Sequence, residues 1–174
     1  MFHLVSDALW YAVRTRSRSE KVVREQLLGR GIEPLLPLIS RVSQWKDRRK
    51  RIEWPLFPGY CFARFHLEQK LTVLQTPGVV SIIGSALGTL EPIPDREIEA
   101  LQRVIESHYP YDPYPGLAPG TEVEVVRGPL MGLRGVLMRK GNGSRLVVSI
   151  NLIQQGAAVE INAADLVAVH EAAV

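Results

Sequence analysis

The chain has 174 residues, 46% of them hydrophobic, which is enough for one ordinary domain or two small ones and excludes a globally disordered chain. Its net charge is only +3, from 21 basic and 18 acidic residues, but the charge is unevenly spread. Residues 41–53 carry six basic and two acidic side chains, so the composition predicts a local basic patch rather than a basic protein.

The N-terminal part of the chain is predicted to contain both strands and helices. Residues 9–15 (LWYAVRT) alternate in the manner of a strand. Ser17, with Glu20 three residues later, has the form of a capping box and predicts the start of a helix. Residues 32–40 are apolar but contain two prolines, which suits an edge strand better than a central one.

The basic segment that follows is predicted to form an exposed hairpin or loop. Residues 60–65 (YCFARF) give the clearest strand of this part, and a short helix over 67–75 and a strand over 79–83 come next. The last helix is predicted to begin at Asp95, and it places four side chains on one face: Ile98, Leu101, Gln102 and Ile105.

Residues 108–120 (HYPYDPYPGLAPG) divide the chain. Their four prolines remove backbone donors, so we expect a linker through which neither helix nor sheet continues. Five short strand-like segments follow and predict a small β-barrel, with a hairpin turn at Gly141-Asn142-Gly143. The expected fold is α+β, with domains over 1–107 and 121–174 joined by this linker.

The sequence contains no constellation of catalytic residues. Its histidines are scattered, and no nucleophile or carboxylate pair has suggestive spacing, so we expect a binding protein and not an enzyme. The glycines of residues 127–135 lack the Gly-Lys-Ser/Thr ending of a phosphate loop. The single cysteine, Cys61, is expected in the core of a strand, and no Cys/His cluster has zinc spacing. We therefore expect no metal and no cofactor.

The sequence also gives no sign of a membrane segment. The N-terminal residues MFHLVSDALWY lack the charged and apolar regions of a signal peptide. No apolar run approaches the roughly 18 residues that span a bilayer. We expect a soluble, cytoplasmic protein.

A collinear series of motifs carries a family resemblance. The series begins with WYAVRT and continues with PLLPL, PLFPGY, TPGVVSIIG and PIPDREIEAL. After the proline-rich segment comes PGTEVEVVRGPLMGLRGVLMRKGNGSRLVVSI. In order and spacing, the first set resembles the N-terminal (NGN) domain of the NusG family of transcription elongation and antitermination factors, and the last resembles its KOW motif. The resemblance implies an antiparallel sheet flanked by helices, followed by a small SH3-like KOW barrel.

The resemblance also implies that the N-terminal domain binds the clamp helices of the large subunit of bacterial RNA polymerase and so suppresses pausing. Within PLFPGY, the flanking prolines limit the backbone freedom of Phe57, which lowers the entropy cost of binding. The alternative is that the aromatic rings are core residues, as is usual in a sheet protein. The polymerase-binding residues that the resemblance implies are Phe57, Tyr60, Trp10, Arg14 and Pro58.

The basic segment has two interpretations. It is a solvated loop, or it attracts DNA beside the polymerase through salt-dependent phosphate contacts. Trp45 lies among the cations, where it could stack on an unpaired base. Related factors contact non-template DNA from the first helix, so the expected nucleic-acid-binding residues come from both regions: Arg16, Arg18, Arg24, Trp45, Lys46, Arg48, Arg49, Lys50 and Arg51.

Two stretches resemble specialised paralogues such as RfaH more than the general factor. They are WPLFPGY and INLIQQ, and the second stands where the general factor has SIFGR. The missing Phe-Gly-Arg argues against recruitment of the termination factor Rho and favours an operon-specific antiterminator. The partner of the KOW domain, ribosomal protein S10 or Rho, is expected to contact Asn151, Leu152 and Ile153.

RfaH-like proteins can refold their C-terminal domain into helices. Here Val147, Val148 and Ile150 favour strands, so we expect a stable barrel. The protein is expected to be a monomer. Two alternatives stay open, which are the housekeeping NusG acting with Rho and a KOW-type RNA- or ribosome-binding protein.

Overall fold

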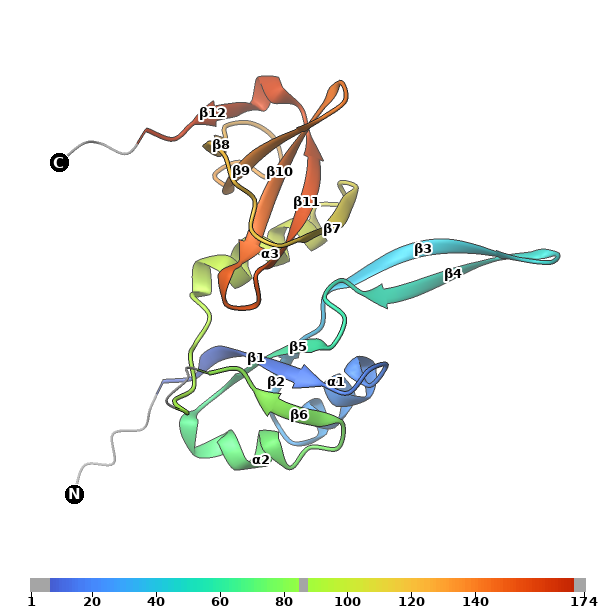
Figure 1. The fold of residues 1–174 in the computed structure, drawn as a ribbon, viewed down its shortest axis with the longest axis vertical. Helices are drawn as coiled ribbons and strands as arrows, with labels where there is room; N and C mark the ends of the chain where they lie inside the picture. The colour runs from blue at the N-terminus through green and yellow to red at the C-terminus, as the bar shows by residue number, and fades with distance from the viewer. Residues whose placement is uncertain (1–6, 85–87, 171–174) are drawn as a thin grey trace. The chain divides into compact units, whose positions relative to one another are not determined.

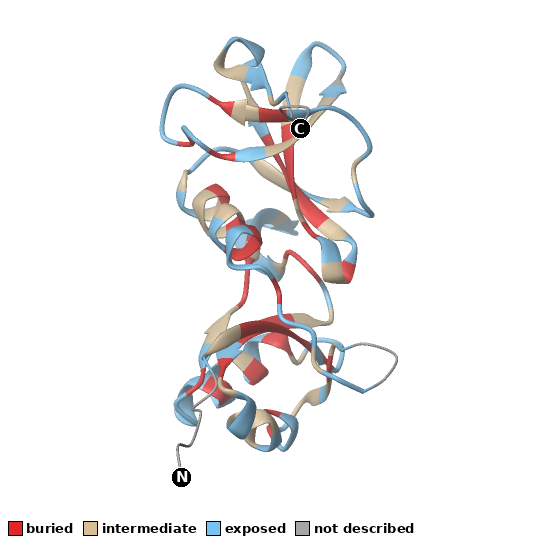
Figure 2. Ribbon diagram, turned by 90° about the vertical axis from the view of Figure 1, so that its left-hand side faces the viewer, coloured by how far each residue is buried: buried red, intermediate tan, exposed pale blue. Residues whose placement is uncertain are grey.

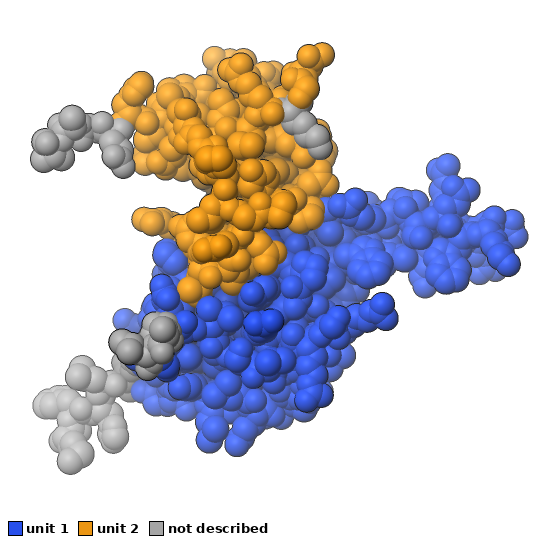
Figure 3. Space-filling view, in the orientation of Figure 1, with its two compact units in different colours: residues 1–95 blue, residues 96–174 orange. Residues whose placement is uncertain are grey.

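The computed structural model describes residues 7–84 and 88–170 (Figure 1). The chain divides into two compact units, residues 1–95 and 96–174 (Figure 3). The first combines a sheet with helices, and the second is built on an all-β sheet. The α+β prediction is therefore confirmed.

The first unit contains a four-stranded antiparallel sheet in the order β2-β5-β1-β6. Helix α1 (Glu20–Gly29) contacts β2 and β5, and a 3-10 turn leads into α2 (Lys70–Leu74), which contacts β6. The strands are close to those predicted: β1 (Leu9–Thr15), β2 (Glu33–Leu35), β5 (Tyr60–Phe65) and β6 (Val79–Ile82).

One face of this sheet forms a hydrophobic core with the helices. Because successive side chains of a strand point to opposite faces, alternate residues of β1 and β5 reach the core. The rings of Tyr11 and Phe65 lie 4.6 Å apart between their centroids. Figure 2 shows buried residues running along these central strands. The core also includes Val13, Cys61 and Ala63 from the strands and Val23 and Leu27 from α1.

The capping box predicted at the start of α1 is wrong. The residue that precedes the helix is Ser19, and its side chain makes no capping hydrogen bond. Glu20 is buried, and its Oε1 accepts a hydrogen bond from the N–H of Gly59 at 2.9 Å. The Glu20 side chain therefore binds the backbone N–H of Gly59, which is far away in the sequence, and not the start of its own helix as the capping box predicted.

The basic segment forms a two-stranded hairpin of β3 (Leu38–Trp45) and β4 (Arg48–Pro55). The turn has two residues, and its first, Lys46, has a φ of 20°. Figure 1 shows the hairpin projecting from the four-stranded sheet. The structure confirms the predicted hairpin but divides the strand predicted over residues 32–40. Of the two strands in this range, β2 lies at one edge of the four-stranded sheet, whereas β3 pairs with β4 in the hairpin.

Helix α3 (Asp95–Glu106) belongs, apart from its first residue, to the second unit. Its buried residues are Glu97, Ile98, Leu101 and Val104, so the face predicted from Ile98 and Leu101 is only partly correct. The guanidinium of Arg103 donates hydrogen bonds to the carbonyl oxygens of Pro129 (3.2 Å) and Met131 (2.7 Å). The domain boundary was predicted at residue 107, after the end of α3. The two compact units instead divide between residues 95 and 96, at the start of α3.

The second unit contains a six-stranded sheet in the order β12-β8-β9-β10-β11-β7. Five of its strands match the prediction. The predicted turn joins β9 to β10 and has Gly141 at a φ of 60°. The five strands are β8 (Glu122–Val125), β9 (Arg134–Lys140), β10 (Gly143–Ile150), β11 (Gln155–Ile161) and β12 (Leu166–Ala168).

The sixth strand, β7 (Tyr111–Pro115), lies inside the segment predicted to be an unstructured linker. It pairs with β11 at the edge of the sheet. Pro113 and Pro115 are two residues apart, so their missing N–H groups fall on the same side of the strand. An edge strand tolerates this arrangement because only one side of its backbone needs to pair. The proline argument therefore excluded a central strand but not an edge strand.

Candidate functional site

The PLFPGY segment forms a turn that is fixed to two neighbouring elements. The N–H of Tyr60 donates to the carbonyl oxygen of Phe57 (3.1 Å), and Gly59 has a φ of 84°, as the third position of a type II turn requires. The N–H of Gly59 donates to Glu20, and the carbonyl oxygen of Gly59 accepts from the N–H of Thr15 (2.8 Å). The turn is thus held to the start of α1 and the end of β1.

Strand register brings several predicted polymerase-binding residues onto one sheet face. Arg14 lies opposite Tyr60 on the adjacent strand, and Trp10 lies opposite Arg64. These side chains alternate with the core residues, so they share the face opposite the α1 contact. Phe57 joins them because its ring contacts Phe62 edge-on, with 5.9 Å between the ring centroids. We call Trp10, Arg14, Phe57, Pro58 and Tyr60 the β1–β5 surface.

The members of the β1–β5 surface differ in exposure. Arg14 and Pro58 are exposed, and Tyr60 is half-buried. Phe57 is 2% exposed and Trp10 is 6% exposed, so neither ring is presented to solvent in this structure. Aromatic packing accounts for the position of Phe57, which was one of the two interpretations of its sequence context.

The hairpin presents cations and aromatic rings to solvent. Trp45 is 68% exposed and Trp54 is 53% exposed. Among the residues that the structure describes, none forms an ion pair with the exposed side chains of Lys46, Arg48, Arg49, Lys50 or Arg51. The charges of these five side chains are therefore not neutralised by ion pairs within the described part of the chain.

The arginines predicted to extend this patch have different surroundings. Arg16 and Arg18 are exposed in the connection between β1 and α1, where Arg18 has a φ of 63°. Arg24 lies on α1, is half-buried, and forms an ion pair with Glu25 at 3.1 Å. Arg24 therefore has an acidic neighbour that compensates its charge, whereas within the described residues Lys46, Arg48, Arg49, Lys50 and Arg51 form no ion pair.

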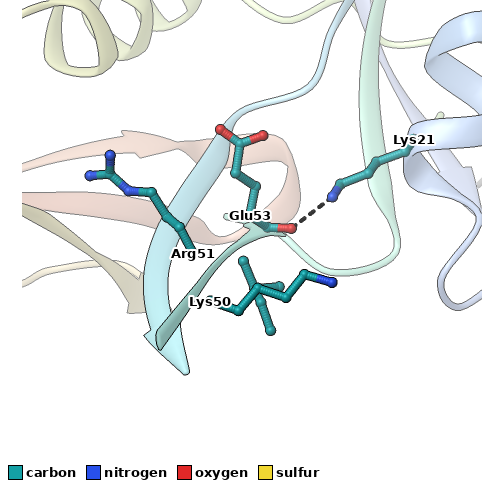
Figure 4. A pocket seen from close by; sticks show the side chains of 5 residues that line it. Lys21, Lys50, Arg51 and Glu53 are labelled. Carbon is teal, nitrogen blue, oxygen red and sulfur yellow. Dashed lines mark hydrogen bonds between the residues drawn. The ribbon is translucent and has the colours of Figure 1, made fainter. Parts of the chain in front are cut away.

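Lys21 is a cation that sequence reasoning missed. Its Nζ donates a hydrogen bond to the backbone carbonyl oxygen of Glu53, 2.8 Å away and 32 residues later in the sequence (Figure 4). A hollow of about 460 Å³ lies here, lined by Lys21, Lys50, Arg51, Ile52 and Glu53. The sequence held no signal for this contact because it depends on how α1 meets the base of the hairpin.

The predicted KOW partner site lies in a 3-10 turn, Asn151–Ile153, between β10 and β11. Asn151 is exposed, Leu152 is half-buried and Ile153 is buried. The N–H of Asn151 donates to Oε1 of Glu97 at 3.4 Å. Burial raises the pKa of Glu97, and the Asn151 hydrogen bond and nearby Arg96 oppose that shift. Within the described chain, Oε2 of Glu97 has no hydrogen-bond partner.

Residues suited to redox or metal chemistry form no cluster. Cys61 is buried in the core, as predicted, and burial raises the pKa of its thiol to about 12, which leaves it in the unreactive protonated form. Across residues 7–84 and 88–170, no group of three or more His, Cys, Asp or Glu side chains could hold a metal ion. No helix in those ranges is long and apolar enough to span a membrane.

An α+β unit followed by a unit built on a six-stranded sheet, with cations and tryptophan rings exposed on the β3–β4 hairpin, is typical of a binding protein. Comparison with known families supports a narrower assignment. The sequence model of the NusG family, described as transcription termination factor nusG, matches residues 8–102. The match extends past the division at residue 95 and into α3.

Individual relatives agree with this match. The transcription termination/antitermination protein NusG of Pseudomonas aeruginosa is 30% identical over 165 residues, covering 87% of this chain and 93% of that protein. The protein of the same description from Escherichia coli K12 is 28% identical over 169 residues, covering 88% and 92%. A solved structure of Thermotoga maritima NusG shares the fold, with a TM-score of 0.53 and 23% identity over 92% of this chain and 96% of that one.

The chain belongs to the NusG family. It is accordingly a transcription termination/antitermination factor of that family, and proteins of this family are not enzymes. The assignment to specialised RfaH-like paralogues stays a prediction.

Proposed function

We propose that this protein binds bacterial RNA polymerase through the β1–β5 surface and suppresses pausing or termination during elongation. One observation carries the proposal. Strand register and a fixed turn gather Arg14, Pro58 and Tyr60 on the sheet face that α1 does not contact. The partner expected from the family resemblance is the pair of clamp helices in the large polymerase subunit.

The members of the β1–β5 surface have different roles in this proposal. Tyr60, Arg14 and Pro58 make the contact, since arginine and tyrosine are typical anchors of protein interfaces. Phe57 and Trp10 support them from beneath, as their burial indicates. The hydrogen bonds of the turn fix its backbone before binding, which lowers the entropy cost of association.

The remaining predicted sites extend this function. The hairpin cations attract DNA beside the polymerase. This role is supported by Lys46, Arg48, Arg49, Lys50 and Arg51, whose side chains form no ion pair within the described chain. The second unit recruits a partner through Asn151–Ile153, for which ribosomal protein S10 is the first candidate. The exposed Asn151 supports a contact at this turn. The RfaH-like sequences WPLFPGY and INLIQQ support an operon-specific role.

The alternative function is that of a general factor acting with Rho. It is favoured by the description of the relatives from P. aeruginosa and E. coli as termination/antitermination proteins. The two functions differ in one assay. A general factor increases Rho-dependent termination on any suitable template, whereas an operon-specific antiterminator reduces termination only where its recruiting sequence is present.

A single-round transcription assay with bacterial RNA polymerase tests the proposal. We expect the full chain to shorten the lifetime of a defined pause, and Tyr60→Ala to lose that effect at the same concentration. Arg30→Ala is the matched control because Arg30 is exposed at the end of α1, which packs on the other sheet face. An unchanged pause lifetime with the wild-type chain on several templates would exclude a general effect on elongation.

A further inference from the structure

The two faces of the β3–β4 hairpin carry different side chains. Pairing places Trp45 opposite Arg48, Ser43 opposite Lys50, Arg41 opposite Ile52, and Ile39 opposite Trp54. These pairs share one face, because side chains of a strand alternate between faces. We call it the tryptophan face, and its members are Ile39, Arg41, Ser43, Trp45, Arg48, Lys50, Ile52 and Trp54.

The opposite face carries less charge and no aromatic ring. Its paired residues include Val42 with Arg51, Gln44 with Arg49, and Ser40 with Glu53. Two arginines there are offset by one glutamate, whereas the tryptophan face has three cations and no acidic residue. This difference in charge between the two faces is not visible in the sequence, because the six cations lie close together within residues 41–51.

We propose that the tryptophan face is a binding platform for single-stranded DNA. Exposed tryptophan rings favour unpaired bases, because a stacked duplex offers no base faces along its length. Trp45 and Trp54 are 68% and 53% exposed, unlike Trp10, which is buried. Cations between the two rings then meet the phosphates that join the stacked bases.

The spacing of the two rings fits a strand of several nucleotides. Trp54 pairs with Ile39, six residues before Trp45 on the same strand. At about 3.3 Å per residue, the backbone positions that carry the two rings lie about 20 Å apart along the hairpin. A strand whose bases stay stacked at the duplex spacing of about 3.4 Å per nucleotide covers the same length with about six nucleotides. The cations Arg41 and Lys50 lie between the two rings in this register.

The base of the hairpin extends the platform with a further cation. In Figure 4 the Lys50 side chain extends toward Lys21, and Arg51 extends away from both. Lys21 also holds the hairpin through its hydrogen bond to the carbonyl oxygen of Glu53. The hollow between α1 and β4 therefore places two lysines where the backbone of a bound strand would leave the hairpin.

This inference rests on the proposed function only for the source of the DNA, which is the strand exposed in a transcribing complex. Its test therefore omits polymerase. Fluorescence anisotropy would follow binding of the full chain to a labelled oligodeoxynucleotide of about 12 residues, beside an oligoribonucleotide and a duplex of the same length. Quenching of tryptophan fluorescence would report stacking directly.

Two double variants compare the contributions of the two hairpin faces to DNA binding, and each removes two positive charges. We expect Arg48→Gln/Lys50→Gln to reduce the slope of log affinity against log salt by about 1.4, at about 0.7 for each phosphate contact. Arg49→Gln/Arg51→Gln should leave the slope unchanged. Trp45→Ala should weaken binding about tenfold, and Trp45→Phe should restore most of it, since a smaller ring still stacks.

Four results would overturn the proposal. They are equal losses from both paired variants, tighter binding of duplex, tighter binding of RNA, and no binding of single-stranded DNA. All variants lie on the exposed hairpin, so their thermal unfolding should match the wild type and serve as the folding control. Failure here with intact polymerase binding would contradict the platform alone, and the reverse result would contradict the β1–β5 surface alone.

Discussion

Phe57 and Tyr60 lie three residues apart in one turn, yet their side chains have different surroundings. Phe57 is buried against Phe62, and Tyr60 is half-buried opposite the exposed Arg14. A buried ring stabilises by filling space, whereas a half-buried ring beside a cation can meet a partner. Substitutions at the two positions should therefore separate folding from binding.

Phe57→Ala should lower the free energy of unfolding of the first unit by about 3–5 kcal/mol, because it leaves a cavity beside Phe62. Phe57→Leu should cost less than about 1.5 kcal/mol, since it keeps an apolar side chain of similar volume. Chemical denaturation followed by far-UV circular dichroism measures both, with separate transitions fitted for the two units.

Tyr60→Ala is the comparison for these variants. It should cost less unfolding free energy than Phe57→Ala while removing more polymerase binding. A Phe57→Ala protein that is as stable as the wild type but no longer binds polymerase would show that the ring is an exposed anchor in solution and would contradict its supporting role.

At the scale of secondary-structure elements, a hydrogen bond between a glutamate side chain and a backbone N–H joins α1 to the PLFPGY turn. The buried Glu20 accepts from the N–H of Gly59, 39 residues later in the sequence. This bond connects the first helix to the turn that carries Phe57 and Tyr60. Helix and interface are therefore coupled through Glu20.

Glu20→Ala should destabilise the first unit by about 1–3 kcal/mol, because it leaves the N–H of Gly59 without its partner. Glu20→Gln keeps an acceptor and should cost less. Amide hydrogen exchange of Gly59 would measure the loosened turn directly. Ser17→Ala is the control, and a loss of about 1 kcal/mol there would contradict the structure by restoring the capping box.

In the second unit, the side chain of Glu97 joins α3 to the turn Asn151–Ile153 through a hydrogen bond. The free energy of unfolding that this buried carboxyl contributes depends on pH. Burial raises the pKa of Glu97 in the folded protein, so folding favours its protonated form. The folded unit therefore loses stability as pH rises from the ordinary glutamate pKa of about 4.3 to the raised value, and the loss is complete above that value.

Glu97→Gln should remove this loss, because it keeps an acceptor for the N–H of Asn151 without a buried charge. We expect the variant to unfold at a higher temperature than the wild type at pH 7 and at a similar temperature at pH 4. Differential scanning calorimetry at the two values tests this. A variant that is less stable at pH 7 would mean that the carboxylate is favourably solvated or paired.

At the scale of the whole molecule, the sequence predicted the fold wherever local patterns decided it. The alternation in residues 9–15 and 60–65 predicted β1 and β5, and the Gly141-Asn142 turn predicted the β9–β10 hairpin. The sequence also predicted the basic hairpin, whereas the binding role of the β1–β5 surface, including its aromatic residues, stays a prediction. What it could not predict was which of those aromatic side chains would be buried.

The remaining features depend on contacts between distant residues. The Glu20 side chain accepts a hydrogen bond from the N–H of Gly59 and does not complete the predicted capping box. The Lys21 side chain donates to the carbonyl oxygen of Glu53, 32 residues later in the sequence. Strand β7 was missed because proline was counted against any strand, although an edge position tolerates it. Each miss has the same physical cause, since tertiary contacts overrode a local preference.

Co-migration of the full chain with bacterial core RNA polymerase tests the central claim most directly. We expect the wild type and Arg30→Ala to bind alike, and Tyr60→Ala to bind about 30-fold more weakly, as the loss of an aromatic anchor worth about 2 kcal/mol would give. Arg14→Ala should also weaken binding. Equal binding by Tyr60→Ala and Arg30→Ala, or no binding by the folded wild type, would contradict polymerase docking through the β1–β5 surface.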